Sequence, residues 1–558
     1  MSTNGISGSG RTIDHEVVII GSGFSGISSL YYAREAGLDV ALLEAGTGVG
    51  GTWHWNTYPG ACTDTEFWSY CFAFAREELS EWRWSTRFPV QKEVEGYLNF
   101  VADRLDLRKY IQFSTRVRSL CYDESENLWT VTAEDGAELV ARYVVTAVGG
   151  LSEPHLPAIP GLDSFRGEIL RSARWPKAEV GFEGKRVALI GTASTGVQIL
   201  PEVASEAKDV YVFQRTPNFV LPKRNKKVDE TQRTAIAANH DEIWQKTWNH
   251  FFAFPLDEPQ GATSDFTAEE REKIFEEKWS EGGFGFSFST FDDIDTSAEA
   301  NEYAAEFVRR KIRETVLDPQ TAELLTPKGY PYGAKRPPVG DGYYEAFNRA
   351  NVHLVDISKQ PISEITPTAL RVGEDEYEVD VIIFATGFDA LTGALSAMEI
   401  VGREGQRLNE QWSQGVRTHT GLATEGFPNL FYVYGPQTPH ANIPPVVQKA
   451  AKWIIEAIKH LRANDLDYIE AETEAMEKWH KELHEAAYAT LLPGSSAESK
   501  AWFLGANIPG KRVDVLVYLG GAHKYLSKVD ELEANGYRGF VLKTQMREPA
   551  APSHAVSG

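Results

Sequence analysis

Two glycine-rich turns, each directly after a short apolar segment, constrain this chain more than any other feature. The first turn spans Gly21 to Gly26 (GSGFSG) and follows Val17–Ile20, while a second apolar segment, Val40–Leu43, precedes Glu44. Strand, glycine turn, helix, strand and acid at this spacing form a βαβ unit that binds a dinucleotide. The glycines let the backbone approach a pyrophosphate, and the acid accepts hydrogen bonds from ribose hydroxyls. The pattern predicts contacts to a dinucleotide from Gly21, Gly23, Gly26 and Glu44.

The second turn, Gly191 to Gly196 (GTASTG), follows the apolar segment Arg186–Ile190. Ala193 replaces the middle glycine, and its methyl group hinders close approach only slightly. The next predicted strand, Val210–Phe213, leads to Arg215 and Thr216, with no acid for a ribose 2′-hydroxyl. A guanidinium suits a 2′-phosphate, so the pattern favours NADPH over NADH. The alternative is an ordinary surface arginine.

Composition narrows the class of protein. The 558 residues, 42% of them hydrophobic, suit a globular enzyme of roughly three domains. The formal charge of −23 argues against nucleic acid as a partner. The three cysteines, Cys62, Cys71 and Cys121, show no metal-like spacing and favour neither a disulfide framework nor a metal site. With no signal-like or membrane-spanning segment in the sequence, we expect a cytoplasmic protein.

The order of the patterns predicts an α/β fold with two Rossmann-like dinucleotide-binding domains and a helical insertion. A stretch rich in Trp, Phe and Glu interrupts the second unit, whose strand pattern resumes at Val352–Val355 and Asp380–Phe384. Leu430–Tyr434 and the amphipathic segment Pro444–Leu461 are expected to return to the first unit. The predicted division is flexible tails at 1–14 and 549–558, an FAD domain at 15–150 plus 386–548, an NADP domain at 151–222 plus 332–385, and an insertion at 223–331.

Two dinucleotide sites in one chain suggest hydride transfer from a nicotinamide to a flavin. Beyond that, the sequence resembles the type I Baeyer–Villiger monooxygenases over almost its whole length. The matching segments are GGTWHWNTYPGACTD (Gly50–Asp64), FRGEILRSARWP (Phe165–Pro176), AKRPP (Ala334–Pro338), DVIIFATGF (Asp380–Phe388) and WFLGANIPGK (Trp502–Lys511). The resemblance implies FAD and NADPH as cofactors, and an apolar ketone and O2 as substrates. It also implies oxygen insertion through a C4a-peroxyflavin to give an ester or lactone.

One residue departs from the family signature FxGxxxHxxxWP: Arg171 stands where the histidine belongs. Arginine keeps a donor and a charge but cannot accept a hydrogen bond. Because the resemblance places this residue in the linker between nucleotide domains, we expect an effect on the coupling of NADPH oxidation to oxygenation.

The resemblance also implies roles for particular residues. Arg336 would hold the anionic peroxide, Asp64 would orient Arg336, and Lys335 would assist Arg215 at the NADPH phosphate. Without the resemblance, Lys335 and Arg336 suggest only a solvated basic pair before a proline turn. The family positions around the flavin are Ser25, Glu44, Thr52, Trp53, Trp55, Asp64 and Tyr70. Those around NADPH are Thr192, Ser194, Thr195, Gln198, Arg215, Thr216, Lys335, Arg336 and Trp502.

Other hypotheses stay open from the sequence. His440 and the segment Gly282–Phe291 are candidates for the substrate pocket, although both patterns also suit ordinary packed loops. A sulfide or amine oxygenase, an NADPH oxidase uncoupled by Arg171, and a flavin-binding redox sensor are the alternative functions. A monomer is the simplest expectation, with a dimer left open.

Overall fold

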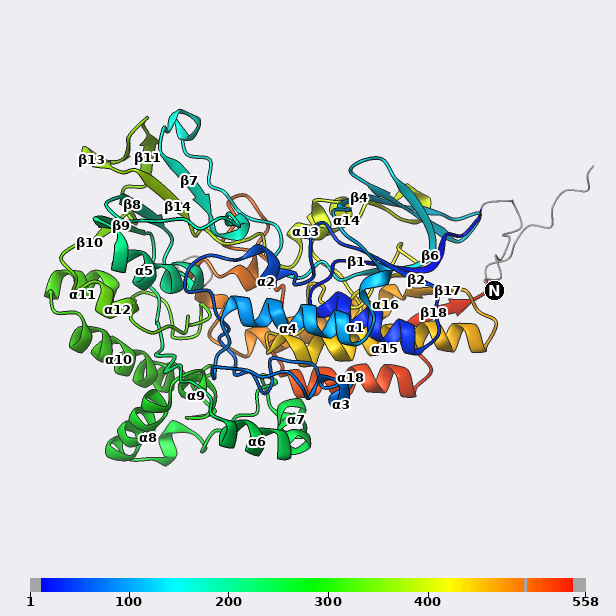
Figure 1. Cartoon of the computed structure of the whole chain (residues 1–558). Coiled ribbons are helices and arrows are strands. Elements are labelled where there is room, and N and C mark those ends of the chain that lie inside the picture. Colours follow the sequence, from blue (N-terminus) through cyan, green and yellow to red (C-terminus); the bar gives the residue numbers. More distant parts are fainter. Residues whose placement is uncertain (1–11, 496–498, 545–558) are drawn as a thin grey trace, which may run out of the picture.

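The computed structural model describes residues 12–495 and 499–544. Its element order and two main sheets confirm the predicted α/β class (Figure 1). Most of the predicted tails, residues 1–11 and 549–558, lie outside the described residues. No helix in the described part is long and apolar enough to cross a membrane.

The first sheet is built around the first glycine turn. Parallel strands β1 (His15–Ile20), β2 (Val40–Leu43) and β6 (Glu138–Thr146) pair so that Ile20 lies beside Leu43 and Thr146. Such strands are covered on both faces, which explains the continuous apolar runs in the sequence. Helix α1 (Phe24–Glu35) begins inside the turn. The N-terminus of α1 therefore lies at the carboxyl edge of the sheet, where dinucleotide phosphates bind in such folds.

The second sheet repeats this arrangement with the order β10-β9-β8-β14-β7, all parallel. Helix α5 (Ser194–Glu206) starts in the second glycine turn, between β8 and β9. The predicted strands of this sheet are confirmed, and within the sheet the sequence analysis missed only the edge strand β7. The strand bounds are β7 (Glu168–Arg171), β8 (Arg186–Ile190), β9 (Asp209–Gln214), β10 (Val352–Asp356) and β14 (Val381–Phe384).

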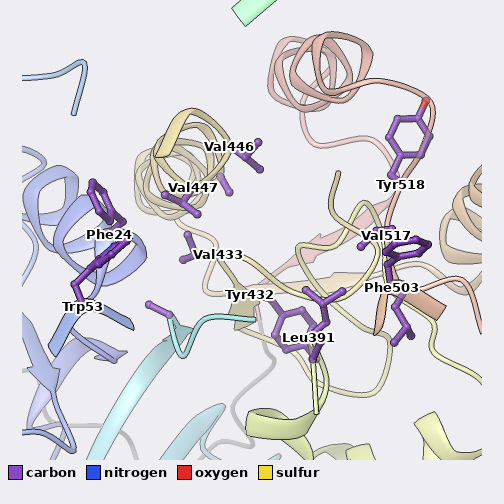
Figure 2. Packing of buried hydrophobic residues seen from close by; sticks show 14 of the residues in the cluster. Phe24, Trp53, Leu391, Tyr432, Val433, Val446, Val447, Phe503, Val517 and Tyr518 are labelled. Atoms are coloured by element: carbon purple, nitrogen blue, oxygen red, sulfur yellow. The ribbon is translucent and has the colours of Figure 1, made fainter. Parts of the chain in front are cut away.

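The C-terminal part of the chain contributes strands to the first sheet. Strand β16 (Leu430–Tyr432) pairs with β6, and β15 (Glu399–Val401) pairs with β4 (Val117–Asp123). Helix α15 (Ile443–Ala463), with proline at its start, packs against α1. Figure 2 shows Val446 and Val447 of α15 close to Val433, with Phe24 of α1 nearby. The first unit is thus assembled from both ends of the chain.

The segment between β9 and β10 is mainly helical, as predicted, and forms the lobe at the lower left of Figure 1. Asp229 and Thr267 form capping boxes at the starts of α6 and α8, satisfying backbone N–H groups there. The helices are α6 (Glu230–Ala238), α7 (His240–Asn249), α8 (Ala268–Glu281), α9 (Gly285–Phe288), α10 (Ala298–Thr315), α11 (Pro319–Leu325) and α12 (Tyr343–Ala346).

Antiparallel strands were not predicted. Strands β17 (Tyr468–Ala471) and β18 (Phe540–Lys543) form one such pair, and there are two larger additions. Strands β4 and β5 (Leu128–Ala133) extend the first sheet beyond β6. Strands β11 (Ile362–Ile365), β12 (Ala369–Val372) and β13 (Asp375–Glu378) form a separate small sheet before β14. Neither addition interrupts the parallel strands that hold the glycine turns.

Candidate active site

A single cavity of about 1620 Å³ is lined by both glycine turns. Sites for one small ligand usually measure about 300–1,000 Å³, so this cavity has room for more than one cofactor. Every predicted site residue except Gly26 and Gly196 lines it. The lining residues from the prediction are Gly21, Gly23, Ser25, Glu44, Thr52, Trp53, Trp55, Asp64, Tyr70, Gly191, Thr192, Ser194, Thr195, Gln198, Arg215, Thr216, Lys335, Arg336 and Trp502.

The two turns share the same steric requirements. Gly21 and Gly191 have φ of +102° and +114°, and an added Cβ would lie 2.6 Å from Ala147 O and 2.4 Å from Ala385 O, respectively. Gly26 and Gly196 lie behind the turns, where a Cβ would come within 1.7 Å of Gly21 O and 2.1 Å of Gly191 O. The outer glycines therefore form the cavity wall, while Gly26 and Gly196 let each helix pack on its turn.

The middle positions of the two turns differ for a local reason. A Cβ on Gly23 would lie 3.4 Å from Gly51 Cα, so a second loop crosses close to the first turn. Ala193 holds the equivalent position in the second turn, with extended backbone geometry. The methyl group that the sequence tolerates there leaves the turn's shape intact.

Glu44, directly after β2, stabilises the first turn through hydrogen bonds. Its Oε2 accepts hydrogen bonds from the Ser22 N–H (2.7 Å) and the Ser22 hydroxyl (2.8 Å), and its Oε1 accepts from the Gly46 N–H (2.6 Å). A carboxylate offers about four acceptor positions, so one is left on Oε1 for a ribose hydroxyl. Glu44 is buried and lines the cavity.

Two cations line the second nucleotide turn without a carboxylate to neutralise them. Arg215 and Lys335 form no ion pair with any described residue, yet Arg215 lies close enough to disfavour the positive charge of Lys335. Burial, with a further contribution from Arg215, lowers the pKa of Lys335 to about 8. An anion between the two side chains would relieve this repulsion, as a nucleotide phosphate does.

Asp64 and Arg336 meet on the cavity surface. Arg336 Nη2 donates a 2.8 Å hydrogen bond to Asp64 Oδ2, and Arg336 Nη1 makes a weaker contact of 3.4 Å with the Ser194 hydroxyl. The Arg336 side chain is 28% exposed, whereas that of Asp64 is 10% exposed. A fixed guanidinium on a partly dry cavity stabilises negative charge on a neighbouring oxygen far better than water does.

Lys223 is a site residue that the sequence analysis missed. Its ammonium lies 3.2 Å from Asp64 Oδ1, donates to the Thr63 carbonyl (2.8 Å), and contacts Cys62 Sγ at 2.7 Å. Although burial opposes ionisation, Lys223 and then Arg336 hold the pKa of Asp64 below its usual range. Asp64 is therefore an ionised carboxylate between two cations. The only signal in the sequence was one lysine among four basic residues at the start of the predicted insertion.

Three predicted cofactor residues also form hydrogen bonds with other protein groups. Trp53 Nε1 donates to the Tyr70 hydroxyl at 3.2 Å, which fixes both rings at the cavity. Gln198, predicted to contact NADPH, donates to the Cys62 carbonyl at 3.1 Å and accepts from the Tyr58 hydroxyl at 3.1 Å. Gln198 thus joins helix α5 of the second unit to the loop that holds Asp64.

The candidate segment Gly282–Phe291 contributes aromatic side chains to the cavity. Phe284 lies 4.9 Å from the Arg336 guanidinium, and Phe288 stacks on Phe252 with ring centroids 3.9 Å apart. His440 also lines the cavity, and burial lowers its pKa to about 4, so its imidazole is neutral at physiological pH. The wall facing Arg336 is therefore mostly apolar.

Arg171 lies at the end of β7 and also lines the cavity. It pairs through the backbone with Phe384, while neighbouring Arg174 stacks on Trp55 at 4.4 Å. The departure from the family signature therefore lies on the cavity that both turns share.

The residues present fit two dinucleotides. The glycine turns are cradles that a Cβ would fill, Glu44 retains an acceptor position, and Arg215 with Lys335 offers unpaired positive charge for a phosphate. Within the described residues, no cluster of His, Cys, Asp and Glu side chains could hold a metal ion.

Comparison with known proteins places these features in a family. A family model for flavin-binding monooxygenase-like proteins matches residues 14–232. A Baeyer–Villiger monooxygenase of Pseudooceanicola batsensis is 40% identical over 531 residues, covering 95% of this chain and 96% of that protein. A phenazine N-monooxygenase of Lysobacter antibioticus is also 40% identical, over 94% of this chain and 97% of its own length.

Solved structures agree with these sequence relatives. Cyclohexanone monooxygenase from Rhodococcus sp. Phi1, bound to NADP+, has a TM-score of 0.92 and 42% identity, covering 95% of this chain and 99% of that one. The OTEMO complex with FAD and NADP has a TM-score of 0.91 and 38% identity, covering 95% and 100%. This similarity across nearly the whole chain shows that the protein belongs to the type I Baeyer–Villiger monooxygenases, which use FAD and NADPH to insert an oxygen atom from O2 beside a ketone carbonyl.

Proposed function

We propose that the protein converts apolar cyclic ketones to lactones, with Arg336 as the cation that faces the reacting oxygen. The observation that supports this is the Asp64–Arg336 pair, which lies on one cavity with both glycine turns and an aromatic wall. An apolar wall favours an apolar substrate by the hydrophobic effect. Cyclohexanone, the substrate in the name of one structural relative, is the first ketone to test.

We further propose a division of the binding surface. Residues 15–150 plus 386–548 would bind FAD, through Gly21, Gly23, Ser25, Glu44, Thr52, Trp53, Trp55 and Tyr70. Residues 151–222 plus 332–385 would bind NADPH, through Gly191, Thr192, Ser194, Thr195, Gln198, Arg215, Thr216 and Lys335, and Trp502 of the first domain would also contact it. The pairing of β15 and β16 with the first sheet supports the discontinuous first domain.

The bound cofactors would supply the reducing equivalents and the activated oxygen for this reaction. The chain's own residues would hold the reacting groups in position and stabilise negative charge on the reacting oxygen. Arg336 places positive charge on the cavity, Asp64 fixes the guanidinium, and Phe284 and Phe288 exclude water around it. Excluding water strengthens every electrostatic interaction inside the site.

The test is product analysis with the purified holoenzyme, NADPH, cyclohexanone and isotopically labelled O2. A lactone that contains one labelled oxygen atom supports the proposal, and the same assay with NADH measures cofactor preference. Hydrogen peroxide formed without lactone would favour the uncoupled oxidase, and Arg171→His would then show whether Arg171 causes the uncoupling.

Heteroatom oxygenation is the second candidate function. The 40% identity to a phenazine N-monooxygenase over nearly the whole chain supports it, because the name of that relative describes oxygenation at nitrogen. Phenazine and a simple thioether, tested in the same assay, separate the two functions. An N-oxide or sulfoxide without lactone from any ketone tested would contradict the leading proposal.

A further inference from the structure

Asp64 has a cation on each side, and only one of them reaches the cavity. Arg336 lines the cavity, while Lys223 lies behind Asp64, is 3% exposed and does not line the cavity. The two carboxylate oxygens are divided between these cations, with Oδ1 toward Lys223 and Oδ2 toward Arg336. The cluster therefore has one more positive than negative charge, and the surplus faces the cavity.

We infer that Lys223 is a positioning residue for oxygen insertion: it neutralises Asp64 from behind, so that the positive charge of Arg336 remains available to the reacting oxygen. Without Lys223, Asp64 and Arg336 would form an isolated ion pair with no net charge. A neutral pair attracts a developing oxyanion much less strongly than a cation does at the same distance. This inference rests on the proposed role of Arg336.

The groups around Lys223 fix its ammonium beside Asp64. The Thr63 carbonyl and Cys62 Sγ contact its ammonium, and Asp341 Oδ1 accepts from its backbone N–H at 3.0 Å. Phe88 lies beside the ammonium, with its ring centroid 5.8 Å away. Burying a lysine is costly unless its charge is paired, so the Asp64 contact compensates for the loss of hydration.

The position of Lys223 in the chain also connects separate parts of the fold. It follows β9 of the second unit and begins the helical insertion, whereas Cys62, Thr63 and Asp64 belong to the first unit. Together with Gln198, it fixes the Asp64 loop against the second unit. Lys223 therefore sets both the charge and the location of Asp64.

The groups around Asp64 allow a distinctive pH test. Besides Lys223 and Arg336, the charged or titratable side chains near it are Tyr58, Tyr70 and Cys62, with Asp341 near Cys62. Burial raises the pKa of Tyr58, Tyr70 and Cys62 above their reference values. These groups therefore stay neutral in an assay between about pH 6 and 8. Removing Lys223 would raise the pKa of Asp64, and protonating Asp64 would then restore the free charge of Arg336.

The experiment compares wild type, Lys223→Met, Asp64→Asn, the double variant and Lys223→Arg as holoenzymes. In Lys223→Met, we expect flavin reduction by NADPH to persist and lactone formed per NADPH to fall by about tenfold, with more hydrogen peroxide released. The loss should lessen as pH falls, should be smaller in the Asp64→Asn background, and should be partly reversed in Lys223→Arg. Lys226→Met, an exposed lysine three positions along, is the matched control.

A second readout does not depend on turnover. The unfolding temperatures of the same set form a double-variant cycle. Asp64→Asn leaves Lys223 buried and unpaired, Lys223→Met leaves Asp64 paired with Arg336 alone, and the double variant removes both charges. We expect the double variant to be more stable than the sum of the single effects predicts, and it also provides a folded protein if Lys223→Met fails to fold. Wild-type lactone yield and pH profile in Lys223→Met, or additive unfolding temperatures, would overturn the inference. If wild type forms no lactone while the cycle shows coupling, the proposed ketone reaction has failed and the Lys223–Asp64 ion pair stands.

Discussion

Arg336 Nη2 and Asp64 Oδ2 lie 2.8 Å apart although 272 positions separate them in the chain. Asp64 belongs to a loop of the first unit, and Arg336 precedes the return to the second sheet. The pair therefore exists only when both units and the insertion are correctly assembled. A cation held in this way needs little reorganisation when negative charge develops beside it.

Replacing Arg336 tests the central electrostatic role. We expect Arg336→Ala to keep its flavin and its reduction by NADPH, because the glycine turns and Arg215 are unchanged. Oxygenation should fall by about 10²–10³-fold, the usual effect of losing one preorganised donor. Rapid-mixing measurement of flavin reduction, alongside lactone yield, separates the two steps. Unchanged lactone formation in this variant would remove Arg336 from its proposed role.

Lys335 gives NADPH binding a predictable dependence on pH. Its pKa in the free protein is lowered to about 8 by burial and by Arg215, and a bound phosphate would raise it again. Binding should therefore take up a proton near pH 8, and NADPH affinity should fall as pH rises above that value. Titration calorimetry in buffers of different ionisation enthalpy measures the proton uptake. Lys335→Met should abolish the uptake, and an unchanged signal in that variant would assign the proton elsewhere.

Arg215 should decide between the two nicotinamide cofactors. Arg215→Ala is expected to raise KM for NADPH by at least about tenfold, equivalent to about 1.4 kcal/mol, because a phosphate loses a guanidinium partner. KM for NADH should change little, since NADH has no 2′-phosphate. Steady-state kinetics with both cofactors checks this, and an equal loss with NADH would indicate a general effect on the fold.

Asp64 contributes stability with a particular sign in pH. Because its folded pKa lies below the usual value, its ionised form stabilises the folded protein above the ordinary aspartate pKa of about 4, and this is lost as pH falls through the folded value. Asp64→Asn leaves Lys223 buried and unpaired, at a cost of about 3–5 kcal/mol at neutral pH. Denaturant unfolding of both proteins from neutral to acid pH should show the difference shrinking. A difference that is constant with pH would indicate packing alone.

The contacts that sequence reasoning predicted are those set by local spacing. Strand, turn, helix and acid around Glu44 fall within one short βαβ segment, so their geometry follows from the order of residues. Resemblance to a family extended this to Asp64 and Arg336, which no local pattern joins. Neither local spacing nor the family resemblance predicted Lys223. Its contacts with Cys62 and Thr63 span 161 and 160 positions, and its sequence context suggests an exposed basic segment.

The strands that the sequence analysis missed lack the continuous apolar runs of the central strands. In β4, buried and exposed residues alternate irregularly, and β13 is mostly exposed. Such strands depend on pairing with a neighbour, and β-propensity alone identifies them poorly. These elements lie outside the parallel strands of the glycine turns, which is why their omission left the predicted site unchanged.

The paired glycines behind the turns offer a purely steric prediction. In Gly196→Ala, the new Cβ would lie 2.1 Å from Gly191 O, so helix α5 must move away from the turn that it supports. We expect weaker NADPH binding and a lower unfolding temperature, with FAD retained because the first turn is untouched.

Gly181→Ala is the matched control, since nothing lies within 4 Å of its added Cβ and its φ is not positive. Gly26→Ala should show the reverse pattern, losing FAD first, because its Cβ would meet Gly21 O at 1.7 Å. Flavin content and NADP+ affinity measured on all three variants distinguish the two turns, and loss of both cofactors in each variant would show that the turns do not act independently.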